Sequence, residues 1–305
     1  MKSAYRNSLA VLVVRIRTMR SSFPLLCASL ILHLPMLGVQ DARVTEAMYR
    51  VSKEASQLWQ IAPGFIGRET LNQKALAHKR SRFRVGVGSE AGGLTEPMYQ
   101  TREMLSFYGL GAFKGSPEAL REFRETYAMD GAPVDDEKKA RGKLAELLSA
   151  GENPAKQAAI AEFDKRCVAG SATDFGQLIL LFTKTNVDKY TYEFGGDTRL
   201  GVDNAWMIQF KQQKGNESLH ISDGGKKTAE KLQGEIWVRQ GDFLPLRVVL
   251  NSTRTHNKNE VRDEAKVDYT VVSGALLPAA IVYRRFLNDE LVLESIYRYA
   301  DWQPR

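Results

Sequence analysis

The chain has 305 residues, a formal net charge of +7, 26% charged residues and a mean hydropathy of -0.33. These values exclude a disordered chain and a membrane protein with many spanning segments. The length fits one or two domains.

The positive charge is concentrated at the N-terminus. Five of the 43 basic side chains and none of the 36 acidic ones lie in residues 1–40. Residues 41–305 therefore carry 38 basic and 36 acidic groups, a net charge of +2. A nearly neutral body cannot neutralise a phosphate backbone densely, so we expect no nucleic-acid partner.

Residues 1–40 have the three parts of a secretory leader. A basic start precedes the uncharged apolar residues 23–39, and Gln40-Asp41 follows as a polar exit. This pattern predicts export to the periplasm or cell envelope. The segment is either a cleaved signal peptide, with Met19 as a possible alternative start, or an uncleaved N-terminal anchor. Residues 43–305 show no shift in composition and are expected to form a single domain.

Helical and extended patterns alternate in the first half of the body. Spacings of three and four predict a helix from Asp41 to Pro63. Its apolar positions are Val44, Ala47, Met48, Val51, Ala55, Leu58 and Trp59. Alternation predicts strands at 82–87 and 99–108. Residues 120–129 fit either a helix or a strand, and Asp130-Gly131 favours a strand that ends in a hairpin.

The middle third is predicted to be helical. Asp135 or Asp136 can cap one helix, and Asn153-Pro154 can begin a second that runs towards Cys167. Thr173-Asp174 then precedes an octet, residues 175–182, that contains no charged side chain. The octet predicts a short helix that is covered on nearly all sides, either as a core helix or as a lid over an apolar interior.

From Asp188 onward the chain is predicted to consist of strands and turns. The expected strands are 189–194, 205–212, 218–221, 235–239, 246–255, 261–272, 279–286 and 290–299. Turn signals separate them at 195–196, 223–225, 241–242, 257–259, 273–274 and 288–289. Residues 261–272 alternate most clearly, with Asp263 as the one strongly polar residue on the apolar side. The pattern favours an antiparallel meander with one face in water.

No catalytic, metal-binding or cofactor-binding motif is found. The histidines of the body are scattered, and Gly109-Leu110-Gly111 lacks the spacing of a dinucleotide fingerprint and is interpreted as a loop. Cys167 is the one cysteine of residues 41–305 and is interpreted as a small buried hydrophobe. Asp263-Glu264 is interpreted as a solvated pair. We therefore expect neither an enzyme nor a bound cofactor.

Several short sequences in the second half resemble a known family. They are Gly234-Glu235-Ile236-Trp237-Val238, the Leu244-Pro245-Leu246 strand, Val267-Asp268-Tyr269, Leu276-Leu277-Pro278 and Tyr297-Arg298-Tyr299. The region 175–302 resembles the LolA-like superfamily of outer-membrane lipoprotein carriers and their exported relatives of acidobacterial type. The resemblance implies an α+β fold, in which a curved antiparallel sheet, an incomplete β-barrel, wraps around helices that form a lid.

The resemblance also implies a set of ligand-binding residues. The lid or plug residues would be Phe175, Leu178, Leu181 and Phe182. The inner positions of the sheet would be Trp237, Val248, Leu250, Val267, Tyr269, Ile281 and Tyr283.

Together these inferences predict a non-enzymatic envelope protein that binds a lipid, an acyl chain or another hydrophobic group in a half-open barrel. Contact with the membrane would be transient or made through an uncleaved N-terminal segment. The alternative is a periplasmic interaction module with a fully packed core that binds an envelope protein partner. A third possibility is a hydrolase without a familiar motif.

Overall fold

The computed structural model describes residues 41–77, 98–215, 219–223, 226–256 and 258–305. The strand predicted at 82–87 lies outside these residues. None of the described helices is both long enough and apolar enough to span a membrane.

The described residues contain three α-helices, all outside the last third of the chain. They are α1 (Ala42–Ile61), α2 (Glu137–Ala150) and α3 (Asn153–Arg166). Three short 3-10 turns accompany them: η1 (Ala62–Gly64), η2 (Leu178–Phe182) and η3 (Val187–Lys189). Asp41 and Asp136 cap α1 and α2 by accepting backbone N–H groups, and Pro154 lies in the first turn of α3. The predicted starts of these three α-helices are therefore confirmed.

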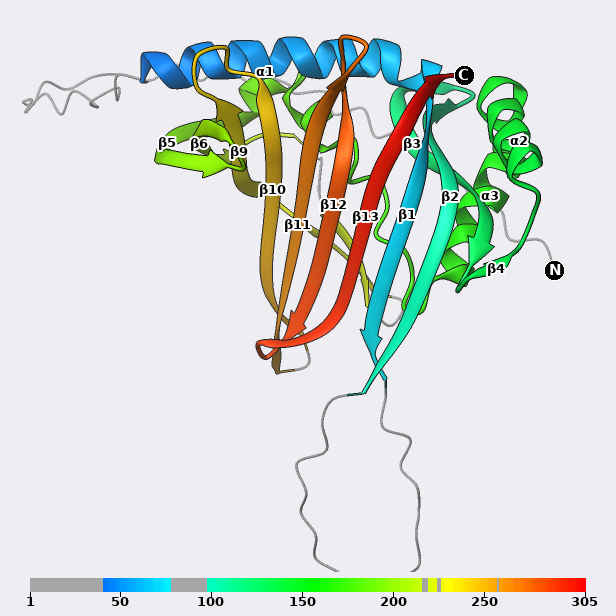
Figure 1. The fold of residues 1–305 in the computed structure, drawn as a ribbon. Coiled ribbons are helices and arrows are strands. Elements are labelled where there is room, and N and C mark those ends of the chain that lie inside the picture. Colours follow the sequence, from blue (N-terminus) through cyan, green and yellow to red (C-terminus); the bar gives the residue numbers. More distant parts are fainter. Residues whose placement is uncertain (1–40, 78–97, 216–218, 224–225, 257) are drawn as a thin grey trace, which may run out of the picture. The chain divides into compact units, whose positions relative to one another are not determined.

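One large sheet dominates the molecule (Figure 1). Its strands in chain order are β1 (Phe65–Leu76), β2 (Tyr99–Phe113), β3 (Ser116–Met129), β4 (Ala132–Pro133), β5 (Tyr190–Leu200), β6 (Asp203–Gln212), β9 (Gln233–Arg239), β10 (Pro245–His256), β11 (Asn259–Val272), β12 (Ala275–Leu287) and β13 (Glu290–Pro304). A separate hairpin pairs β7 (Leu219–Asp223) with β8 (Lys226–Glu230).

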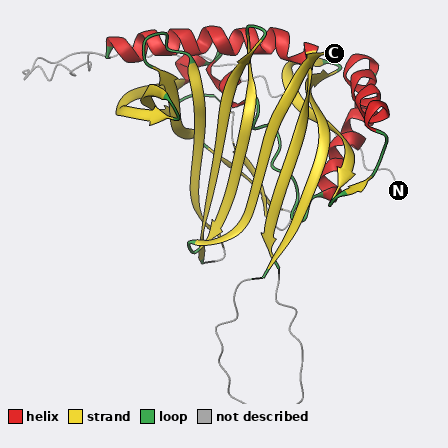
Figure 2. Ribbon diagram, in the orientation of Figure 1, coloured by secondary structure: helices red, strands yellow, loops and turns green. Residues whose placement is uncertain are grey.

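The large sheet is antiparallel and does not close. Its spatial order is β4-β3-β2-β1-β13-β12-β11-β10-β9-β6-β5, so β4 and β5 form opposite edges. Figure 2 shows the sheet bending, with α1 crossing the strands near one end. The predicted fold class, an α+β fold with a curved incomplete barrel, is confirmed, and so is the meander from β9 to β13.

Three turn predictions have two different outcomes. Ser273-Gly274 and Asn288-Asp289 have positive φ angles in both hairpin turns, as the tightest hairpins require. Gly195-Gly196 was wrongly predicted to be a turn, because these residues lie inside β5. They form a bulge that shifts the pairing of β5 with β6, and Gly196 has a φ of 126°. A strand bulge and a turn both favour glycine, so the residue type alone does not separate them.

Gly109-Leu110-Gly111 is also a strand and not the expected loop. It lies within β2, and α2 packs against it. A Cβ atom on Gly109 or Gly111 would lie 2.7 Å or 2.8 Å from a methyl group of Leu148. The two glycines therefore allow the helix to approach the sheet closely.

The sheet has a core on each face. The larger core lies on the inner face and includes α1, η2 and residues of β1, β2, β6 and β9–β13. The smaller core lies on the outer face, where α2 covers β1–β3, and its buried members are Ile66, Phe107, Phe123, Ala140, Leu144 and Leu148. In α1, six of the seven predicted apolar positions are buried. Trp59 is the exception, at 40% exposure.

A truncation inside the smaller core tests whether α2 is held by packing on the outer face. Leu144 is fully buried, so Leu144→Ala is expected to reduce the free energy of unfolding by about 2–5 kcal/mol. Denaturant unfolding measures the change. Glu146→Ala, on the exposed side of the same helix, is the matched control and should change stability by less than about 0.5 kcal/mol. Equal stabilities for the two variants would contradict this packing.

Candidate functional site

The inner face of the sheet is covered by the segment that joins α3 to β5. We call residues 167–182 the strap. The strap contains two left-handed positions, Gly170 and Asp174, and ends in the short η2 turn. The octet 175–182 was predicted to be a helix, and only Leu178–Phe182 form a helical turn, of the 3-10 type. Its backbone N–H groups therefore need partners elsewhere, and the sheet provides them.

Glu122 on β3 is the main polar contact of the strap. Its side chain is fully buried, and its carboxylate accepts the backbone N–H of Asp174 at 2.7 Å and that of Gly176 at 2.7 Å. The same carboxylate accepts the hydroxyl of Tyr108 and a guanidinium N–H of Arg124, both at 3.0 Å. A carboxylate can only accept hydrogen bonds, so these four donors together satisfy it.

Arg124 lies between two buried carboxylates. Its guanidinium donates to Glu69 on β1 at 2.8 Å and 2.9 Å as well as to Glu122, and its side chain is 1% exposed. The rings of Tyr108, Phe163 and Tyr297 lie within 5.3 Å of its central carbon. Burial, opposed by Arg124, raises the pKa of Glu69. A buried triad of this kind is costly to desolvate and costly to break.

Three further buried side chains bind the strap backbone. Gln73 on β1 accepts the N–H of Val168 at 2.7 Å and donates to the carbonyl of Gly170 at 2.9 Å. The hydroxyl of Tyr297 on β13 accepts the N–H of Ala172 at 3.2 Å. The hydroxyl of Tyr269 on β11 accepts the N–H of Ile179 at 3.0 Å. The strap is thus joined to four strands by side chains that reach its backbone.

The inner face has a polar half and an apolar half. On β1, β3 and β13 it carries buried polar groups: Glu69, Gln73, Glu122, Arg124 and Ser295. On β6 and β9–β12 most inward residues are aliphatic or aromatic, and the buried polar exceptions are Gln212, Ser252 and Asp263. The strap matches this division, because its first part offers backbone amides to the polar half and its last part offers apolar side chains to the other half.

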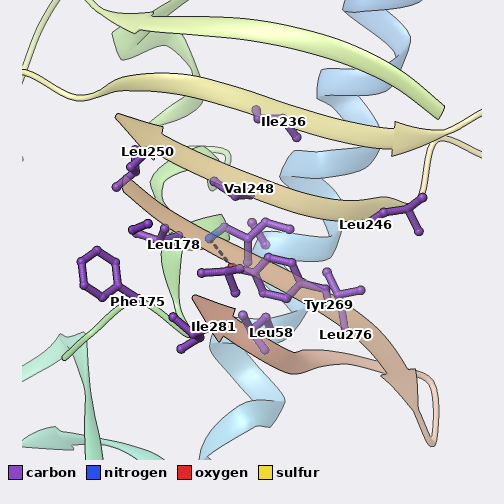
Figure 3. Packing of buried hydrophobic residues seen from close by; sticks show 14 of the residues in the cluster. Leu58, Phe175, Leu178, Ile236, Leu246, Val248, Leu250, Tyr269, Leu276 and Ile281 are labelled. Carbon is purple, nitrogen blue, oxygen red and sulfur yellow. Dashed lines mark hydrogen bonds between the residues drawn. The ribbon is translucent and has the colours of Figure 1, made fainter. Parts of the chain in front are cut away.

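Figure 3 shows how the strap fills the apolar half. Leu178 lies beside Val248 and Leu250, and the dashed line marks the hydrogen bond of Tyr269 to the strap. Phe175 stacks on Tyr283 with ring centroids 5.5 Å apart. Phe182 is fully buried against Tyr190 and Phe210.

Most of the predicted site residues lie in this cluster. The structure buries three of the four strap residues and six of the seven sheet residues in the inner core: Phe175, Leu178, Phe182, Val248, Leu250, Val267, Tyr269, Ile281 and Tyr283. Leu181 is only partly buried and packs at its margin. Binding of a ligand by these residues remains a prediction.

Trp237 was wrongly predicted to point inwards. On β9 the buried neighbours are Ile236 and Val238, so Trp237 lies on the opposite face. There its indole N–H donates to Glu235, and the guanidinium of Arg247 lies 4.9 Å from its ring. A large aromatic residue covered by an arginine can remain on the outside, so size alone does not indicate the inner face.

Asp263 is buried and not solvated as predicted. Its side chain is 2% exposed and contacts Arg254, Arg285 and the hydroxyl of Tyr283. Burial raises the pKa of this carboxyl, but Arg285 and Arg254 outweigh burial and hold it below its usual value. The position of Asp263 on the apolar side of β11 therefore indicates an internal ion pair.

Cys167 begins the strap as a half-buried free thiol. Burial raises the pKa of Cys167 to about 12, so the thiol stays protonated and is a poor nucleophile. Among the described residues, no group of three or more His, Cys, Asp or Glu side chains converges on a point that could hold a metal ion.

Two surface clefts lie away from the strap. One, of about 330 Å³, lies between the start of α2 and the strands β1, β2 and β13, and its lining includes Arg68, Glu137 and Asp301. The other, of about 310 Å³, is lined mainly by polar residues of β5, β6, β9 and β10. Both contain many charged groups, so neither resembles a site for an apolar chain.

Comparisons with known proteins give only distant likenesses. No protein-family model and no curated protein matches the chain. A solved structure of a DUF1329 family protein from Desulfovibrio piger is similar at 10% identity and a TM-score of 0.36. A putative outer membrane lipoprotein-sorting protein domain from Vibrio parahaemolyticus is similar at 8% identity and a TM-score of 0.34. Each alignment covers 85% of this chain and 93% of the other.

The carboxyl group of Asp174 makes the stability of the strap depend on pH. Burial, and next the neighbouring Glu122 carboxylate, raise the pKa of Asp174 to about 6, and Arg121 only partly offsets them. The folded chain therefore binds a proton more tightly than the unfolded chain, and this contribution to stability is lost as the pH rises from about 4 to 7.

Asp174→Asn tests this dependence. Asparagine is uncharged, keeps an oxygen for the Glu122 N–H and tolerates the φ of 66° at this position. The variant is expected to be more stable than the parent at pH 7.5, by about 1–3 kcal/mol, and to lose that advantage near pH 5. Thermal unfolding at both pH values measures it. A lower stability of the variant at pH 7.5 would show that the Arg121 ion pair dominates.

A second variant tests the contact between the strap and β3. A Cβ atom on Gly176 would lie 2.5 Å from the Tyr108 hydroxyl and 2.8 Å from a Glu122 oxygen. Gly176→Ala should therefore break at least one of these hydrogen bonds, cost about 1–3 kcal/mol and speed amide exchange in the strap. The control is Gly142→Ala on exposed α2, where the added methyl group meets nothing within 4 Å. Unchanged exchange in the strap of Gly176→Ala would refute the contact.

Proposed function

We propose that this chain is an exported protein of the periplasm or cell envelope that binds a hydrophobic group on the inner face of its sheet. It acts by binding and not by catalysis. The supporting observation is that apolar side chains of the strap, among them Phe175, Leu178 and Phe182, occupy the apolar half of the concave sheet. Such a group would enter by taking the place of these side chains.

The energetics permit this exchange. A buried methylene contributes about 0.8 kcal/mol, so an acyl chain of ten or more carbons can replace the burial of three or four strap side chains. The strap has little regular structure of its own, and it is held by its buried apolar residues and by hydrogen bonds to side chains of four strands, not by strand pairing. Segments of this kind open locally at a lower free energy than the sheet that they cover.

A second candidate function is a protein-interaction module with a permanently packed core. The observation that favours it is that the strap already fills the inner face, whereas the two surface clefts lie elsewhere. In this case the strap would be structural, and a partner would bind the outer surface or a strand edge.

Lipid transfer combined with hydrogen exchange separates the two functions. The chain would be mixed with vesicles of bacterial polar lipid, separated from them and examined by native mass spectrometry. If the inner face binds a hydrophobic group, a lipid is expected to remain bound to the protein. Amide exchange at Asp174, Gly176 and Ile179 is then expected to be faster, since these amides lose their partners on the sheet. Leu144→Ala, which weakens the outer core, serves as a control for general loosening. A lipid-free protein with unchanged exchange in the strap would support the interaction module.

A further inference from the structure

We infer that the inner face selects amphiphiles whose polar end donates N–H groups, that is, long-chain amines first and amides second, over fatty acids and alkyl phosphates. This inference rests on the proposed function and names the ligand class of the same site. The inference is based on the hydrogen-bond acceptors of the polar half, which the backbone N–H groups of the strap occupy in this structure.

The strap binds the polar half mainly by donating. Four of its N–H groups, those of Val168, Ala172, Asp174 and Gly176, go to buried acceptors on β1, β3 and β13. In the other direction, Gln73 donates to the carbonyl of Gly170, and the Glu122 N–H and the guanidinium of Arg121 donate to the carboxylate of Asp174. A ligand that displaces the strap therefore meets more buried acceptors, on Gln73, Glu122 and Tyr297, than buried donors, because the side chain of Arg121 is 44% exposed and can bind water.

Glu122 is the acceptor for which the loss of the strap donors is most costly. When the strap leaves, its carboxylate loses two of its four donors and keeps Tyr108 and Arg124. Its side chain is fully buried, and an unsatisfied charged acceptor in such a place is costly. Tyrosine hydroxyls can reverse their role and donate, whereas a carboxylate cannot.

The net negative charge of Glu69, Arg124 and Glu122 also favours a ligand that donates N–H groups. Glu69 and Glu122 share the buried cation Arg124, and both carboxylates are within hydrogen-bond distance of it. Arg121, which pairs with Asp174 of the strap, is 44% exposed and lies outside this buried group. An anionic headgroup would add a third negative charge to a region of low dielectric and would bring no donor. An ammonium group brings three donors and a positive charge, and a secondary amide brings one donor.

The apolar half lies beside these acceptors and gives the ligand its orientation. The strap passes from Gly176, which binds Glu122, to Leu178 among Val248 and Leu250 within two residues. A ligand that follows the same course places its polar end at Glu122 and its chain against β10–β12. One molecule can therefore use both halves of the face.

The test compares four ligands with the same twelve-carbon chain: dodecylamine, N-dodecylacetamide, dodecanol and dodecanoate. Their affinities would be measured by calorimetry below the micelle concentration, with the bound species identified by native mass spectrometry. We expect dodecylamine to bind about tenfold or more tightly than dodecanoate, with the amide between them.

Variants locate the preference at the strap site. Glu122→Gln should reduce the ratio of amine to carboxylate affinity about tenfold, because the charge is lost and one oxygen becomes a donor. Glu125→Gln, on the outer face of the same strand, is the matched control and should leave the ratio unchanged. Tyr297→Phe removes one acceptor without a change of charge, and should weaken amide binding even if Glu122→Gln fails to fold.

Each outcome has a defined meaning. Equal affinities for the four ligands, or tighter binding of dodecanoate, overturn the selectivity and leave the proposed function standing. An amine preference that persists in Glu122→Gln, or that is lost equally in Glu125→Gln, also overturns it, since the preference would then come from surface charge. Failure of every ligand to bind, with no lipid taken from vesicles, overturns the proposed function as well.

Discussion

The path of the strap depends on one buried carboxylate, that of Glu122, which needs hydrogen-bond donors. Glu122 lies on the inner face of β3 with its side chain fully buried, and four groups from three parts of the chain donate to it: Tyr108, Arg124 and the backbone of Asp174 and Gly176. Leaving such a group without partners would cost more than most single packing contacts contribute. The path of the strap across the sheet and the need for glycine at 176 follow from this requirement, and the charge of Glu122 adds to the burial that raises the pKa of Asp174.

The division of the inner face links this requirement to function. A concave sheet with a uniformly apolar face would bind any hydrophobic chain, and a uniformly polar face would bind none. Here polar groups on β1, β3 and β13 adjoin mostly apolar groups on β6 and β9–β12, where Asp263 and its arginine partners are the main exception, and one segment covers both. The strap has the pattern of an amphiphile, with amides at one end and Leu178, Ile179 and Phe182 at the other, and the proposed exchange for a bound amphiphile is based on this pattern.

Where the alternating pattern is clean, the sequence predicts the fold well. The strands from β9 to β13, the three helices and most inward positions of the candidate site were predicted, since each depends on a local period of two or of three to four residues. β1 was missed because inward-pointing Glu69 and Gln73 give it the appearance of a polar loop. Side-chain type was also misleading for Asp263, which was assigned to solvent, and for Trp237, which was assigned to the interior. In each case a partner distant in sequence reverses the preference of the side chain.

The sequence by itself determined the antiparallel meander, the helix starts and the apolar character of the octet 175–182. These depend on the order of residues within a few positions, which any reader of the chain can see. Only the tertiary structure decided that the octet lies on the inner face as part of a strap, and that Gln73, Glu122, Tyr269 and Tyr297 bind its backbone. Those contacts join residues about 50 to 130 positions apart, and the burial that makes them strong exists only after the sheet has formed.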